Sequence, residues 1–315
     1  MNKTSSNSEE LEARVHTHQI PVMITPEDWA IADSTPILQL LDSRLPARRL
    51  YPNDGFSRAV VALIEEYFDE WMARLTVHTR WHHRESAEFA AAEMMKLEGV
   101  PQDQINQLID SPSSPVHWGK RVCRALGMSS VKQIAAGEAE LMRIHKALDL
   151  HLETNRYVLG DAPCAIDCVL LGGLRAHFLT DPWPRKFLAG LANVQRYYDE
   201  WDRQIPSTAQ ASPIDPTNLP PFVEFVLREM GGGFKNFVLG NSEAQVNGSK
   251  AFKAQVYGEE VSYLSRPYVE KSRRMLQQYT GTMLNEEERR LYIVLLEKYH
   301  IKDLYTPRVL EHSRL

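Results

Sequence analysis

The chain has 315 residues, of which 43% are apolar and 24% charged, with a formal net charge of −5. This is the composition of an ordinary globular protein, with room for one large domain or two. The charge gives no reason to expect nucleic acid or an anionic membrane as a partner, and the apolar runs are too short to span a membrane. The polar start lacks the apolar core of a signal peptide, and three cysteines without CxxC spacing favour reduced thiols and a cytoplasmic location.

Residues 1–14 are expected to be a disordered or weakly helical leader, and residues 15–46 a β-β-α unit. The run from Ile20 to Ile24 is short, apolar and rich in β-branched residues, and a Thr-Pro-Glu-Asp turn separates it from a second short strand. Asp33 and Ser34 are candidate N-caps for the helix that follows, which has a proline in its first turn.

The start of this helix has a possible chemical use. Its unpaired backbone N–H groups suit a carboxylate. If the Ile20–Pro21 bond is cis, the backbone of Val22 turns outward and can pair with a peptide-like ligand. The alternative interpretation is an ordinary hairpin followed by a capped helix.

Ile20-Pro21-Val22, followed by Asp33-Ser34-Thr35, resembles the second half of the thioredoxin-like domain of cytosolic glutathione transferases. In that family the proline is cis, and the backbone of the next residue pairs with the cysteinyl part of glutathione. The acidic residue and the serine bind the γ-glutamyl carboxylate and amine. The resemblance therefore implies glutathione binding by Pro21, Val22, Asp33 and Ser34.

After a linker at residues 44–54, amphipathic helices dominate the chain as far as residue 203. The first of them carries an apolar stripe at helical spacing. Further helices are predicted at residues 86–98, 102–109, 116–126, 130–153, 168–178 and 186–201. The helix at 168–178 is apolar on all sides, which is typical of a helix at the centre of a helical domain.

The start of that central helix has the shape of a capping box, with Cys164 at the cap and Asp167 three residues later. The stretch from Leu159 to Asp167 resembles the motif that opens the central helix of the glutathione transferase C-terminal domain, where Ser or Thr is the cap. A thiol is a weak acceptor, so we expect this helix start to be weakened by up to about 1 kcal/mol.

Residues 203–221 read as a linker, and residues 222–315 as an extension with a small α+β content. A helix should break at Gly231–Gly233, a hairpin should form at 250–264, and two helices should follow. We expect a packing or dimerising role and see no catalytic motif here. The expected fold is a partial thioredoxin-like α/β unit (15–46), then an all-α glutathione transferase C-terminal domain (55–203), then this extension, mostly α overall.

A histidine cluster follows the first long helix. His78 and His82 are four residues apart and share a face, a spacing that can chelate a metal, and Glu85 could add a carboxylate. Interleaved arginines and the lack of an HExxH pattern argue against this, so we predict no metal site. The resemblance implies instead that Trp71, His78, Trp81 and His82 line a pocket for an electrophile; plain helix packing is the alternative.

In glutathione transferases a hydroxyl or thiol activates the bound thiol, and it belongs to a β-α-β unit that precedes the proline strand. Such a unit needs about 30 residues, and only twenty precede Pro21. No catalytic residue can therefore be assigned, unless the natural start lies upstream. The expected function is glutathione binding, with conjugation or reduction of a small hydrophobic electrophile; the alternative is a non-catalytic binding or interaction protein. The family implies a homodimer, and either a partner or the extension should cover the exposed sheet edge.

Overall fold

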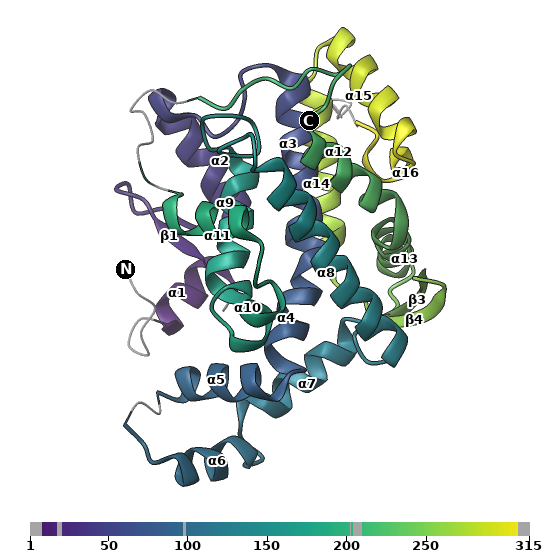
Figure 1. Cartoon of the computed structure of the whole chain (residues 1–315). Helices are drawn as coiled ribbons and strands as arrows, with labels where there is room; N and C mark the ends of the chain where they lie inside the picture. The colour runs from purple at the N-terminus through teal and green to yellow at the C-terminus, as the bar shows by residue number, and fades with distance from the viewer. Residues whose placement is uncertain (1–7, 18–20, 97–98, 202, 204–209, 308–315) are drawn as a thin grey trace.

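The structure, a computed structural model, describes residues 8–17, 21–96, 99–201, 203 and 210–307 (Figure 1). The protein is mostly α-helical, with two small antiparallel sheets, as the sequence predicts at this coarse level. Among the described residues, none of the helices has the length and apolar character needed to cross a membrane.

The N-terminal part contains a two-stranded hairpin between two helices. Its elements are α1 (Ser8–Val15), β1 (Val22–Ile24), β2 (Ala30–Ala32) and α2 (Ser34–Arg44). The strands pair antiparallel, and α1 and α2 both pack against β2. The predicted strands and helix are thus present. The expected cis bond before Pro21 lies outside the described residues, because Ile20 is not among them.

One long helical path forms the centre of the molecule. The helix α3 (Gly55–Tyr67) continues through a π-helical turn, η2 (Phe68–Met72), into α4 (Ala73–Trp81). Every residue of α3 except Arg58 is buried, so this helix has partners on all sides. The remaining elements of the helical part are η1 (Pro46–Arg48), α5 (Arg84–Met95), α6 (Gln102–Asp110), α7 (Pro115–Ala125), α8 (Val131–His151), α9 (Ala165–Gly173), η3 (Leu174–Phe178), α10 (Pro182–Phe187) and α11 (Ala192–Glu200).

The C-terminal extension supplies a second set of elements. They are α12 (Pro221–Glu229), η4 (Met230–Phe234), α13 (Lys235–Val246), β3 (Ala251–Val256), β4 (Glu259–Leu264), α14 (Pro267–Met283), α15 (Glu286–Lys298) and α16 (Lys302–Tyr305). The predicted hairpin is confirmed: Tyr257 and Gly258 form its turn with positive φ angles of 49° and 71°, the signature of a type I′ turn. The predicted break at the three glycines is a kink at Gly232, after which α13 follows directly.

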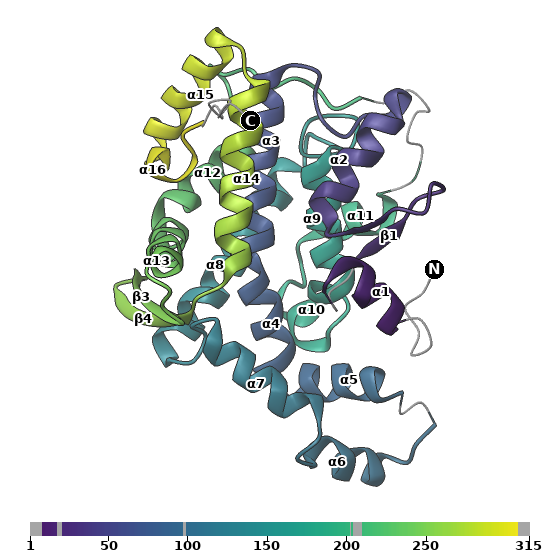
Figure 2. The ribbon, with the colours of Figure 1, turned by 180° about the vertical axis from the view of Figure 1, so that it is seen from behind.

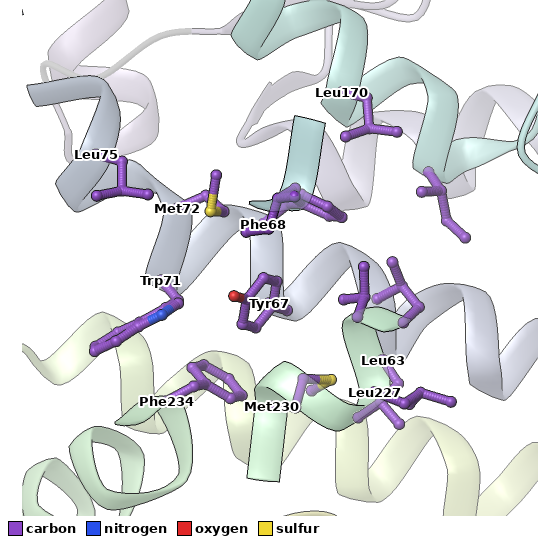
Figure 3. Packing of buried hydrophobic residues seen from close by; sticks show 14 of the residues in the cluster. Leu63, Tyr67, Phe68, Trp71, Met72, Leu75, Leu170, Leu227, Met230 and Phe234 are labelled. Atoms are coloured by element: carbon purple, nitrogen blue, oxygen red, sulfur yellow. The ribbon is translucent and has the colours of Figure 1, made fainter. Parts of the chain in front are cut away.

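The extension and the helical part share one hydrophobic core (Figure 3). Tyr67 and Trp71 of the central helical path meet Phe234 of η4 edge to face, with ring centroids 5.3 Å and 6.2 Å apart. Such aromatic pairs add about 0.5–1.5 kcal/mol beyond the area that they bury. The extension is therefore an integral part of this core.

The extension does not cover the hairpin edge. In Figures 1 and 2 the helices α14 and α15 pack on α3, and the β1–β2 hairpin lies on the opposite side of that helix. For the part of the chain that the structure describes, this leaves the other expected cover, a partner chain, as the prediction that stands. The extension lies elsewhere because α3 is buried all round and needs apolar partners on the side away from the hairpin.

The predicted capping box at the start of α9 is confirmed, with Cys164 at the cap and Asp167 three residues later, and the carboxylate makes further hydrogen bonds. Asp167 accepts hydrogen bonds from the N–H of Cys164 at 2.7 Å, from the N–H of Val158 at 3.0 Å and from the hydroxyl of Tyr197 at 2.8 Å. The buried carboxylate thus ties the helix start to the preceding loop and to α11. These bonds offset the weakness that a cysteine cap brings.

Candidate functional site

Within the part of the chain that the structure describes, no strand occupies the outer edge of β1. The N–H of Asp33 donates to the C=O of Pro21 at 3.1 Å, and Met23 is the register partner of Ile31. Because backbone groups in an antiparallel ladder alternate in direction, residues 21 and 23 face β2 and Val22 directs its N–H and C=O outward. Within the described residues, β1 pairs with no strand other than β2. An extended peptide can therefore add along Val22.

The junction between β2 and α2 is strained at Asp33. Its φ and ψ angles are 85° and 139°, a region that residues other than glycine rarely adopt. Its side chain caps α2 by accepting from the N–H of Thr35 at 3.3 Å. The hydroxyl of Ser34 makes only a long contact of 3.5 Å to the same carboxylate. Strain of this kind costs about 1–3 kcal/mol and gathers at functional sites.

A second carboxylate lies near this junction. The hydroxyl of Thr35 donates at 3.2 Å to Asp69, on the π-helical turn η2 of the central helical path. Burial and the negative charge of Asp33 raise the pKa of Asp69 to about 6. The two carboxylates thus repel each other, and a cationic group between them would relieve the repulsion. Turns of π-helix are frequent at functional sites.

The same helical path carries three more buried carboxylates, on Glu65, Glu66 and Glu70. Burial is the main cause of the raised pKa of each, to about 8, 8 and 7 respectively. Two of them accept hydrogen bonds: Glu65 from the hydroxyl of Tyr51 at 2.8 Å, through one of its two oxygens, and Glu66 from the hydroxyl of Ser272. The acidic character is therefore a property of this whole region and not of Asp69 alone.

A cleft of about 780 Å³ opens between the segment that follows α2 and the helix α9. Its lining is mostly apolar, and Arg48, Arg49 and Arg175 contribute guanidinium groups to it. The guanidinium of Arg175 also lies over the ring of Trp201, 5.5 Å from its centroid. A cleft with this lining suits a small apolar molecule that carries negative charge.

Cys168 lines this cleft but is not a nucleophile at neutral pH. Burial, helped by the negative charges of Asp167 and Glu65, raises the pKa of its thiol to about 12. The thiolate is the reactive form of cysteine, and it is absent near pH 7 at such a pKa.

The four residues expected to line an electrophile pocket lie at two places: Trp71 lies next to the extension, and the other three lie at the end of α4. Trp71 is buried and donates its indole N–H to Glu140 at 2.8 Å, next to the extension. Trp81 is buried at the end of α4, where its ring packs edge to face on Trp118 at 6.0 Å. His78 is buried beside the turn between α4 and α5, and His82 at that turn is exposed. None of these four side chains is part of the lining of the cleft at Arg175.

Sequence reasoning thus named Pro21, Val22, Asp33 and Ser34, which the structure brings together at one end of the hairpin. It missed Asp69 and the three arginines of the cleft. One signal for Asp69 was in the sequence: the carboxylates of residues 65–70 interrupt an otherwise apolar helix. The arginines carry no such signal, because nothing local distinguishes them from solvent-exposed side chains.

Comparisons with protein-family models, with curated proteins and with solved structures found no match to this chain.

Proposed function

We propose that this protein binds glutathione in the manner of a glutathione transferase, at the outer edge of β1 and the N-terminus of α2. The observation that carries the proposal is the strained backbone of Asp33, whose φ is 85°, directly between these two elements. Strain persists where the surrounding structure holds it in place, and a binding site is its usual location. A partial thioredoxin-like origin of the hairpin and α2 belongs to the same proposal.

Each predicted residue has a role in this proposal. The backbone of Val22 pairs with the cysteinyl residue of the ligand, as an added strand does. The hydroxyl of Ser34 and the N-terminal N–H groups of α2 hold the γ-glutamyl carboxylate. Asp33, with Asp69 nearby, holds the γ-glutamyl ammonium group, which supplies the positive charge that two neighbouring carboxylates favour. Pro21 fixes the start of β1 through its hydrogen bond with Asp33.

Transfer of the bound thiol to a small hydrophobic electrophile is the second part of the proposal. The cleft at Arg175 is the best candidate to hold that electrophile, because its lining is mostly apolar. The residue that would activate the thiol stays unassigned. The alternative is a non-catalytic protein that binds glutathione or another molecule. The family resemblance further suggests a cytoplasmic location and a homodimer. Light scattering of the purified chain would test the homodimer.

The test is calorimetric titration of the full chain with reduced glutathione. We expect binding, with at least about a tenfold loss of affinity in Ser34→Ala, because a hydrogen bond to a charged group is removed. Cysteinyl-glycine, which lacks the γ-glutamyl group, should bind more weakly than glutathione and should be insensitive to Ser34→Ala.

The single variants Val22→Pro and Ile24→Pro form a matched pair that tests the backbone contact between Val22 and the ligand. Both residues direct their N–H groups away from β2, so neither proline removes a bond of the hairpin. Only Val22→Pro should weaken glutathione binding. The proposal would be overturned by a folded wild-type chain that does not bind at millimolar glutathione, or by equal affinities in wild type, Ser34→Ala and Val22→Pro.

A further inference from the structure

A cluster of two imidazoles and a carboxylate lies far from the hairpin, where α4, the start of α5 and α8 meet. The Nε2 atoms of His78 and His83 each lie 3.0 Å from the same carboxylate oxygen of Glu138. One ligand atom from each of the three residues lies within 4.8 Å of the other two. His78 is fully buried, and the side chains of His83 and Glu138 are half-buried, so the cluster is partly accessible to solvent.

The local fold fixes the direction of each ring. The backbone of His82 is still helical, but that of His83 is extended, with φ −85° and ψ 122°, so the chain reverses direction between them. The ring of His83 lies flat on Trp183, with centroids 3.5 Å apart and planes 5° from parallel. Trp183 in turn stacks on Phe187 at 4.7 Å. The His83 imidazole is thereby held in place toward Glu138 without help from a ligand.

The carboxylate of this cluster has no permanently cationic side chain beside it in the part of the chain that the structure describes. Among the described residues, the ion-pair partners of Glu138 are these two histidines, and no lysine or arginine lies within ion-pair distance of its carboxylate. A half-buried carboxylate is costly away from water unless a cation lies beside it. A bound divalent cation would compensate the charge of the carboxylate.

The spacing fits a transition metal. With zinc bonds of about 2.0–2.1 Å in tetrahedral geometry, ligand atoms lie about 3.3 Å apart, close to the 3.0 Å separations between nitrogen and oxygen here. Imidazole nitrogens select zinc and its first-row neighbours, whereas calcium and magnesium prefer oxygen ligands only. Three protein ligands leave a fourth position open, as in catalytic zinc sites.

We propose that His78, His83 and Glu138 form a binding site for a divalent transition-metal ion, with zinc the best fit. The site is independent of the proposed glutathione site. The exposed imidazole of His82 stacks on His78 with centroids 4.7 Å apart. The bound ion ties the turn between α4 and α5 to α8, which is 55 residues further along the chain from His83.

The sequence pattern indicated a different set of candidate metal ligands. His78 and His82 have the helical spacing of a chelating pair, and Glu85 was the carboxylate within reach. In the structure Glu85 forms an ion pair with Lys186 on α10. The ligand that completes the cluster, Glu138, comes from a helix distant in sequence, and only the reversal of the chain at His83 brings the second imidazole to it.

The test is titration of the metal-free full chain with Zn²⁺ by calorimetry, in buffer without thiols, and with Co²⁺ by visible absorption. We expect one zinc ion per chain, and intense cobalt bands of a four-coordinate site that zinc abolishes. His83→Asn and Glu138→Gln should each lower the affinity at least about tenfold. Both residues are half-buried, so the variants are expected to fold, and circular dichroism checks this.

His117→Asn is the matched control, because this exposed histidine on α7 makes no contact with the cluster. It should bind zinc as the wild type does. The proposal is overturned if the folded wild type binds no zinc, if the cobalt complex has only the weak bands of an octahedral ion, or if His83→Asn and Glu138→Gln bind as tightly as His117→Asn.

Discussion

The strain at Asp33 predicts that Asp33→Gly keeps or raises the stability of the fold while it weakens glutathione binding. A glycine adopts φ 85° and ψ 139° without penalty, so Asp33→Gly should recover the strain energy of about 1–3 kcal/mol. Two costs oppose this gain. Replacing the aspartate cap by glycine costs about 0.3 kcal/mol, and the greater freedom of glycine in the unfolded chain costs about 0.5–1 kcal/mol. The net expectation is a free energy of unfolding between unchanged and about 2 kcal/mol higher.

Asp33→Ala separates strain from capping. Alanine keeps the Cβ atom and thus the strain, and it loses the cap, so the free energy of unfolding should fall by about 1 kcal/mol. Urea denaturation followed by tryptophan fluorescence gives both values, provided that the denaturant slope is unchanged. Both variants should bind glutathione at least about tenfold more weakly than the wild type, because both lack the carboxylate.

Substitutions of Lys96 provide a reference for the difference in stability between Asp33→Gly and Asp33→Ala. It ends α5 in the ordinary left-handed conformation, with φ 56° and ψ 48°. The difference in stability between Lys96→Gly and Lys96→Ala should be about 1 kcal/mol, with no effect on glutathione binding. The difference between Asp33→Gly and Asp33→Ala should be larger. If the two Asp33 variants were equally stable, the backbone there would carry no strain, and the reasoning that places a binding site at this junction would be refuted.

Three further predictions concern the core and its charges. Glu140→Gln should lower the free energy of unfolding by about 3–5 kcal/mol in denaturant melts, because it leaves the buried guanidinium of Arg74 without its ion-pair partner. A loss below about 1 kcal/mol would contradict this prediction. Gly119→Ala should cost about 1–3 kcal/mol in the same assay, since the new Cβ atom would lie 2.2 Å from the ring of Trp81. The contribution of Glu66 to stability should fall between pH 4.5 and about 8, because burial raises its pKa from 4.5 to about 8 and the group releases its proton later when folded than when unfolded. Glu66→Gln should flatten this fall, measured by denaturation at each pH.

The sequence by itself determined the local elements of this protein. The positive-φ turn at Tyr257-Gly258 forms the predicted hairpin, and Asn285 caps α15 with Glu288 closing its capping box, as expected of a good cap. The apolar periodicity around Val60 marks α3 as a buried helix. These features depend on interactions within a few residues, so their signals lie within a few residues in the chain.

Only the tertiary structure decided which charged side chains meet. Asp69 reaches Thr35 across 34 positions of the sequence, and Glu138 reaches His78 across 60. Nothing in the neighbourhood of Asp69 or Glu138 encodes such a partner, because the contact depends on how the helices pack and on the direction in which the chain leaves each helix. A buried carboxylate must find a hydrogen bond or a cation, and the packing of distant helices determines which one it finds.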